Sequence, residues 1–154
     1  MTQYLVVLSI AGSDPSGGAG IQADLKTLSA LGVYAASVIT ALTVQNTCGV
    51  SRVVCVEPEM VEAQIRAVVS DLRPSVIKVG MVGSQAVLEA IVRTLCDVAC
   101  GVPLIVDPIL KSSSGADLME PAAQAYFCRY FLPLVTLLTP NLPETAALTG
   151  LPVE

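Results

Sequence analysis

Short apolar runs alternate with amphipathic stretches along the whole chain. The apolar runs predict buried strands, because they are rich in β-branched residues and too short for helices. The stretches between them repeat apolar residues every three or four positions, which predicts helices with one buried face. The expected strands are 4–10, 34–44, 50–56, 76–79, 104–106 and 135–138, and the expected helices are 20–31, 58–72, 84–99, 121–131 and 143–148.

The most regular of these patterns belongs to the helix 58–72. It begins at Pro58, and proline is favoured at the first helical position. In the next helix, Ser84 is placed to cap the first turn, because its hydroxyl can accept a hydrogen bond from an unpaired backbone N–H. The buried stripe expected for the helix 58–72 consists of Met60, Val61, Ile65, Val68, Val69 and Leu72.

The alternation of strands and helices predicts an α/β fold with one mostly parallel sheet flanked by helices. Ligands of such sheets bind at the carboxyl ends of the strands. Five expected strands are followed by polar residues or by a glycine turn, so we expect a small-molecule site along that edge. The residues at these positions are Asp14, Gln45 and Asn46, Gly80 and Met81, Asp107, and Asn141.

The composition fits one globular domain, residues 1–154. Hydrophobic residues make up 53% of the chain and charged residues 14%. The mean hydropathy of +0.71 is high for a soluble protein. However, no apolar run reaches the ~18 residues that a membrane-spanning helix needs. Strands buried on both faces of a parallel sheet explain the hydropathy instead. The N-terminus lacks the basic region of a signal peptide, so we expect a cytoplasmic protein without membrane partners.

Charge and cysteine usage exclude several classes of function. The net charge is −5, and the eight Lys and Arg residues are scattered, which argues against a nucleic-acid partner. The chain has no histidine, which excludes Ser-His-Asp and Cys-His triads within it. Five cysteines without a C-x-x-C pair are typical of reduced thiols, and we expect them to be buried as small apolar residues. Cys96 and Cys100 are spaced to face a common metal, but the absence of histidine argues against structural zinc.

The run AGSDPSGGAGIQADLK, residues 11–26, connects the first strand to the first helix. A glycine-rich turn of this kind lets a ligand approach bare backbone beside the unpaired N–H groups of the helix. The same turn can equally be a packing device. Neither G-x-G-x-x-G nor a Gly-Lys pair is present, so the two common nucleotide fingerprints do not apply.

A family resemblance extends over almost the whole chain. The segments that carry it are, in order, AGSDPSGGAGIQADLKTLSALGVY, VITALTVQNTCGV, IKVGMVGS, VDPILKSSSG and LLTPNLPETAALTG. Together they resemble the hydroxymethylpyrimidine/phosphomethylpyrimidine kinases of thiamine biosynthesis, members of the ribokinase-like superfamily. The resemblance implies an ATP- and Mg²⁺-dependent enzyme that phosphorylates 4-amino-5-hydroxymethyl-2-methylpyrimidine and then its monophosphate. It also implies a possible homodimer.

The resemblance assigns the pyrimidine side of the site to the first half of the chain. Gln45 is implied as the reader of the ring, since its amide can bond both the exocyclic amino group and a ring nitrogen. Asp24 is implied near the substrate hydroxyl, although an acid in a first helical turn can simply complement the helix dipole. Met81 is implied against the ring, and a core position is its alternative. The other implied contacts are Gly12, Gly18 and the backbone of Val44.

The triphosphate side is assigned to residues late in the chain. The resemblance implies that Asp107 and Glu144 hold Mg²⁺, mostly through water. It implies that Asn141 binds water or phosphate. Helix capping is the alternative for Asn141 and Glu144. No role is assigned to Lys111.

Members of the family extend well beyond residue 154. Their later part carries a Gly-Thr/Ser-Gly-Cys turn with the catalytic group, an anion hole and most of the adenine pocket. We therefore expect the chain to be the N-terminal portion of such an enzyme and to lack kinase turnover by itself. The alternatives are a pyridoxal kinase on the same scaffold and a non-catalytic ligand-binding domain.

Overall fold

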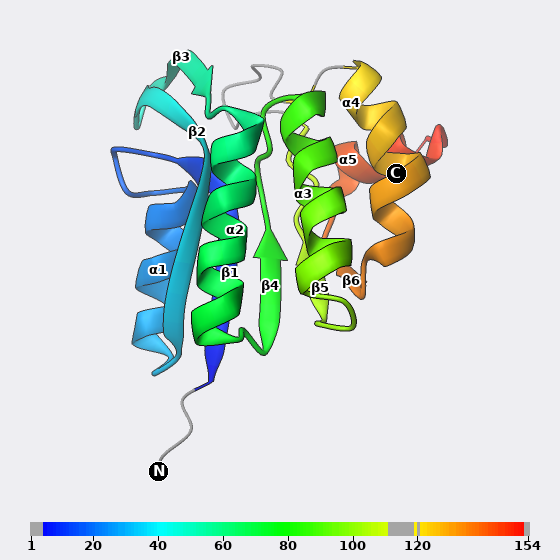
Figure 1. Cartoon of the computed structure of the whole chain (residues 1–154). Helices are drawn as coiled ribbons and strands as arrows, with labels where there is room; N and C mark the ends of the chain where they lie inside the picture. Colours follow the sequence, from blue (N-terminus) through cyan, green and yellow to red (C-terminus); the bar gives the residue numbers. More distant parts are fainter. Residues whose placement is uncertain (1–4, 111–118, 120, 153–154) are drawn as a thin grey trace.

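One six-stranded sheet runs through the protein in the computed structural model, which describes residues 5–110, 119 and 121–152 (Figure 1). The elements, in chain order, are β1 (Val6–Ser13), α1 (Gly20–Ala30), β2 (Tyr34–Asn46), β3 (Gly49–Cys55), α2 (Pro58–Leu72), β4 (Val76–Val79), α3 (Gln85–Val98), β5 (Leu104–Val106), α4 (Pro121–Tyr126), β6 (Leu137–Leu138) and α5 (Leu142–Thr149). None of the helices in this described part combines the length and the apolar character that a membrane crossing requires.

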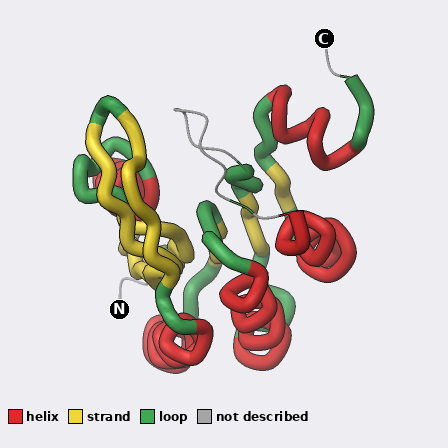
Figure 2. Tube along the Cα trace, turned by 90° about the horizontal axis from the view of Figure 1, so that it is seen from above, coloured by secondary structure: helices red, strands yellow, loops and turns green. Residues whose placement is uncertain are grey.

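The strand order β3-β2-β1-β4-β5-β6 confirms the predicted α/β sheet. All neighbouring strands pair in parallel except β3, which returns antiparallel along β2. Figure 2 shows α2 and α3 on one face of the sheet and α1 on the other. The chain winds outward in both directions from the boundary between β1 and β4, so this boundary is the point where the strand order reverses.

The main hydrophobic core lies between the sheet and the helices α2 and α3. Alternate residues of each strand point to this face, as the period of a strand requires. Full burial of a Leu, Ile or Val side chain contributes about 1.5–3 kcal/mol, so this layer supplies much of the folding free energy. Its fully buried members include Leu8, Ile10, Val38, Ile77 and Val79 from the sheet and Val61, Ile65, Leu88 and Ile91 from the helices.

The predicted stripe of α2 is right at its centre and wrong at its start. Val61 and Ile65 are fully buried, but Met60 is 57% exposed. Successive residues of a helix are about 100° apart, so the position before Val61 faces away from the sheet. The predicted helix 121–131 also changes character, because α4 ends at Tyr126 and continues as a π-helical turn, Phe127–Phe131.

The expectation that the cysteines are buried is wrong. Four of the five are exposed and Cys128 is half-buried. Cys48 lies in the turn between β2 and β3, and Cys55 lies on β3, an edge strand whose last five residues are exposed. Cys96 and Cys100 do not belong to a larger cluster, since the described residues contain no group of three or more metal-ligating side chains.

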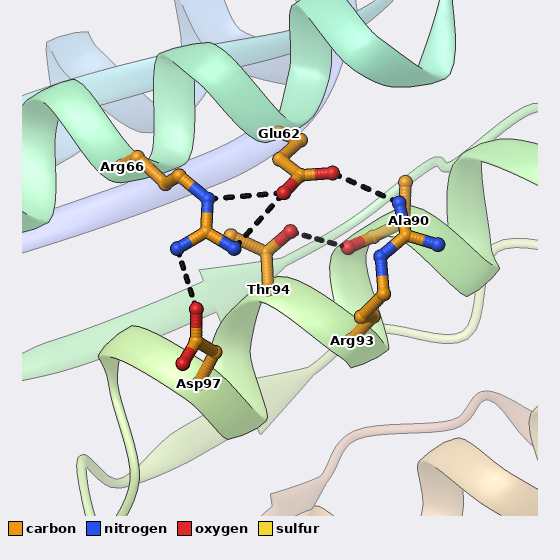
Figure 3. Close-up of polar contacts among 6 residues, drawn as sticks. All are labelled: Glu62, Arg66, Ala90, Arg93, Thr94 and Asp97. Carbon is orange, nitrogen blue, oxygen red and sulfur yellow. Dashed lines mark hydrogen bonds and ion pairs between the residues drawn. The ribbon is translucent and has the colours of Figure 1, made fainter.

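An ion-pair network joins α2 to α3 on the outer surface (Figure 3). Glu62 binds Arg66 at 2.9 Å and Arg93 at 2.8 Å, and Arg66 also binds Asp97 at 2.6 Å. Arg93 and Asp97 are each more than 60% exposed. Water screens ion pairs at such exposed positions, so we expect the network to contribute little to stability.

Candidate functional site

The carboxyl ends of the parallel strands meet at one edge of the sheet, and the predicted polar residues lie along it. Gln45 is near the end of β2, and Asp107 directly follows β5. Asn141 begins α5 just after β6. Ligands of open α/β sheets bind outside this edge where the strand order reverses, which here is between β1 and β4.

The glycine-rich loop after β1 is organised around the carboxylate of Asp14. Asp14 is 3% exposed. Its Oδ1 accepts hydrogen bonds from the backbone N–H and the hydroxyl of Ser16, both at 2.8 Å. Its Oδ2 accepts from the backbone N–H groups of Gly18 at 3.1 Å and Ala19 at 2.9 Å. Burial raises the pKa of Asp14, but these hydrogen bonds outweigh it and leave the pKa below its ordinary value.

Two side chains of α1 form hydrogen bonds to the same loop. Gln22 accepts a hydrogen bond from the Asp14 N–H at 2.9 Å and donates one to the Ser13 hydroxyl at 2.7 Å. Lys26 donates from Nζ to the Gly17 carbonyl at 2.9 Å. The loop is therefore fixed from within by Asp14 and from the helix by Gln22 and Lys26.

Close packing requires glycine at two positions of this region. A Cβ at Gly20 would lie 2.3 Å from the Gly12 carbonyl oxygen, and the φ of Gly20 is +56°. A Cβ at Gly12 would lie 3.1 Å from Met81 Sδ. The packing interpretation of the glycine-rich turn is therefore correct, and the ligand-access interpretation stays a prediction.

A cleft of about 420 Å³ separates the glycine-rich loop from the turn between β2 and β3. This volume is within the range of small-molecule sites. Gly18 and Gln45, two of the predicted substrate contacts, line opposite sides of it. Its full lining is Asp14, Ser16, Gly18, Ala19, Gln45, Asn46, Thr47, Cys48, Gly49 and Val50.

Four other predicted contacts do not line this cleft. Gly12 and Met81 are buried, and the Met81 carbonyl accepts a hydrogen bond from the Thr40 hydroxyl at 2.6 Å. Val44 is 58% exposed on β2. Asp24 points from α1 toward the sheet, where its Oδ2 accepts hydrogen bonds from Ser9 Oγ at 2.5 Å and Lys78 Nζ at 2.8 Å.

Sequence reasoning missed two residues that organise this region. The segment from Asp14 to Gly18 is typical of a turn, but the role of the Asp14 carboxylate in closing that turn was not predicted. Lys78 was not considered. The signal for it was a lysine inside the apolar strand Val76–Val79, because a charged residue in a buried strand requires a partner.

On the triphosphate side, Asn141 and Glu144 form a capping box at the start of α5. Asn141 Oδ1 accepts from the Glu144 N–H, and Glu144 Oε2 accepts from the Asn141 N–H, both at 2.9 Å. The capping interpretation is therefore correct for both residues. It leaves other carboxylate lone pairs of Glu144 for a second interaction, because a carboxylate has about four acceptor sites.

Asp107 is half-buried among charges of both signs. Burial is the main cause that raises its pKa, Lys78 opposes the rise, and the negative charges of Glu144 and Asp24 add to it. A carboxylate with acidic neighbours fits a divalent cation, which would relieve their repulsion. Mg²⁺ usually binds through one or two carboxylates, water and phosphate oxygens, so Asp107 and Glu144 fit that ion. Lys111 lies outside the described residues.

Known proteins are similar to this chain in both sequence and fold. Enzymes named hydroxymethylpyrimidine/phosphomethylpyrimidine kinase are 52% identical over 145 residues in Rhizobium meliloti and 49% identical over 145 residues in Escherichia coli. Each alignment covers 94% of this chain and 54% of the relative. The crystal structure of phosphomethylpyrimidine kinase from Clostridium difficile is 45% identical, with a TM-score of 0.90 over 97% of this chain and 64% of that one.

A second group of similar structures comprises pyridoxal kinases. The Staphylococcus aureus pyridoxal kinase in complex with AMP-PCP and pyridoxal is 32% identical, with a TM-score of 0.83 over 98% of this chain and 53% of that one. The chain spans about half the length of the curated relatives it matches.

The family model for phosphomethylpyrimidine kinase matches residues 14–154. The chain therefore belongs to the phosphomethylpyrimidine kinase family.

Proposed function

We propose that this chain forms the pyrimidine-binding part of an ATP-dependent kinase acting on 4-amino-5-hydroxymethyl-2-methylpyrimidine and its monophosphate. The observation that carries the proposal is the cleft between the glycine-rich loop and the end of β2, where Gln45 lies. Family membership and the relatives named for this activity support it.

Gln45 is the residue that would recognise the ring. A 4-aminopyrimidine presents an N–H donor next to a ring-nitrogen acceptor. The Gln45 amide offers the complementary acceptor and donor, so one side chain can satisfy both. Gly18 stands opposite and presents backbone without a side chain, which leaves room for a flat ring.

Phosphoryl transfer requires the substrate hydroxyl to be aligned with the γ-phosphate and the charge on the phosphate to be neutralised. We assign the first task to Asp24, whose carboxylate lies outside the cleft lining and toward the sheet, where it would accept a hydrogen bond from a hydroxyl that extends beyond the cleft. Asp107 and Glu144 would hold Mg²⁺, mostly through water, and Asn141 would contact water or phosphate. The ion would supply the positive charge that ATP needs at this edge.

Binding measurements on Gln45 variants test the proposal. Gln45→Glu keeps one acceptor but removes both N–H donors and adds a negative charge beside the ring nitrogen. We expect it to weaken binding of the hydroxymethylpyrimidine at least about tenfold, the effect of losing one hydrogen bond at about 1.4 kcal/mol. Gln124→Glu, on α4 and outside the cleft, is the matched control, because its side chain makes only one hydrogen bond among the described residues, an exposed one to the Ala147 carbonyl. Isothermal titration calorimetry or NMR titration gives the dissociation constants.

The same titrations separate the two ring substrates. The proposal predicts tighter binding of the hydroxymethylpyrimidine than of pyridoxal by the unmodified chain. Tighter binding of pyridoxal would favour the pyridoxal kinase alternative. An unchanged pyrimidine affinity in Gln45→Glu would remove the argument for ring recognition.

We further propose a cytoplasmic homodimer without nucleic-acid or membrane partners. Apolar side chains are exposed on the hairpin formed by β2 and β3, where Leu42 is 55% and Val54 47% exposed. Such a surface fits a second copy better than solvent. A monomeric mass in analytical ultracentrifugation at micromolar concentration would contradict the dimer.

A further inference from the structure

Lys78 brings a positive charge to the centre of the sheet. It lies on β4, between the buried residues Ile77 and Val79, and is paired in register with Ser9 of β1. The Lys78 side chain therefore projects from the sheet on the side opposite to the main core. Helix α1 partly covers that side. The ammonium lies at the boundary between β1 and β4, where the strand order reverses.

The ammonium and a serine hydroxyl fix the carboxylate of Asp24. Lys78 Nζ lies 2.8 Å from Oδ2 and 3.1 Å from Oδ1 of Asp24, and Ser9 Oγ donates to Oδ2 at 2.5 Å. The Lys78 and Asp24 side chains are only 24% and 20% exposed. Three hydrogen bonds from two strands thus determine how a side chain of α1 is directed.

Gly80 makes room for the ammonium at the carboxyl edge. A Cβ at Gly80 would lie 3.0 Å from Lys78 Nζ, which shows that the lysine extends along β4 toward the end of the strand. From there its charge reaches Asp107, where it opposes the rise in the Asp107 pKa that burial causes. The Lys78 cation therefore interacts with both Asp24 and Asp107, two carboxylates that repel each other.

We propose that Lys78 is a positioning residue of the phosphoryl-transfer site: it orients Asp24 toward the substrate hydroxyl and separates the negative charges of Asp24 and Asp107. The inference rests on the proposed function, because Asp24 can accept a hydrogen bond from the substrate hydroxyl only if the hydroxymethylpyrimidine binds. A plain structural ion pair between β4 and α1 is the competing explanation. It predicts a loss of stability and no change in hydroxyl recognition.

Two ligands that differ only in the hydroxyl distinguish these explanations. They are 4-amino-5-hydroxymethyl-2-methylpyrimidine and 4-amino-2,5-dimethylpyrimidine, titrated by NMR into the chain and its variants. In the unmodified chain the hydroxyl should improve affinity about tenfold. In Lys78→Met this advantage should fall below about twofold, while the dimethyl compound binds as before. Lys78→Arg, which keeps the charge, should restore part of the advantage.

Controls keep each outcome informative. Arg129→Met removes an exposed cation from the π-helical turn and should leave the advantage unchanged. If Lys78→Met does not fold, Lys78→Gln, which keeps a polar side chain without the charge and leaves Asp24 in place, should show the same loss of advantage. An advantage that persists in the folded variant overturns the positioning role. If neither pyrimidine binds the unmodified chain, the proposed function fails, and the inference fails with it.

Discussion

Replacing Asp14 by asparagine tests whether one carboxylate orders the glycine-rich loop. The substitution conserves shape but turns one acceptor oxygen into an NH₂ group. Either orientation places that group against backbone donors, those of Gly18 and Ala19 on one side or that of Ser16 on the other. The variant therefore creates donor–donor contacts where the native side chain accepts hydrogen bonds at both oxygens.

The expected loss of stability follows from these contacts. Hydrogen bonds to a charged group contribute about 1.5–3 kcal/mol each, and several are affected. Ser16, Gly18 and Ala19 are exposed, so water replaces part of what is lost. We therefore expect Asp14→Asn to lower the free energy of unfolding by about 2–4 kcal/mol at pH 7.

The loss should depend on pH in a defined direction. The folded-state pKa of Asp14 lies below its ordinary value, so its contribution is complete above the unfolded-state pKa and disappears as the pH falls through the folded-state pKa. Urea unfolding followed by circular dichroism at pH 7, 5 and 3 measures it. The difference between native chain and variant should be equal at pH 7 and 5 and smaller at pH 3.

Asp71→Asn, at an exposed position of α2, is the matched control and should change stability by less than about 0.5 kcal/mol. The reasoning is refuted if Asp14→Asn behaves like this control. It is also refuted if the difference is as large at pH 3 as at pH 7.

Two further predictions concern packing and the acidic edge. Gly20→Ala should destabilise the chain by more than about 2 kcal/mol in urea unfolding, because its Cβ would overlap the Gly12 carbonyl at a positive φ. Gly101→Ala, at φ +82° in open space, should cost only about 1 kcal/mol, and equal costs would contradict the packing argument. Since burial raises the pKa of Asp107, this group favours the folded state below the unfolded pKa and loses that contribution as the pH rises through the folded pKa. Asp107→Asn should therefore gain stability relative to the native chain between pH 3.5 and pH 7, and a constant difference over that range would contradict it.

Periodicity was sufficient to predict the elements and the class of fold. Each expected strand and helix has a counterpart, although the helix expected at 121–131 becomes a π-helical turn after Tyr126. Their ends were harder to predict, because they depend on local hydrogen bonds. The strand expected at 135–138 is reduced to Leu137–Leu138, since the N–H of Val135 closes a turn with the Leu132 carbonyl.

The sequence predicted the edge of the sheet at which the candidate residues lie, but it did not predict which side chains contact one another. The shared edge of Gln45 and Asp107 follows from parallel topology alone. The pairing of Asp24 with Lys78 joins residues 54 positions apart, and it depends on the register of β1 and β4. The exposure of the cysteines likewise depends on which strand lies at the edge. No local pattern in the sequence contains such information.

The bracing of the glycine-rich loop has a consequence for how tightly a small molecule can be held. A flexible loop loses conformational entropy when a ligand binds, and this loss lowers the net affinity. Here Asp14, Gln22 and Lys26 impose the ordering during folding. Less of the free energy of contact with an incoming ring is therefore spent on ordering the loop, and more of it contributes to affinity.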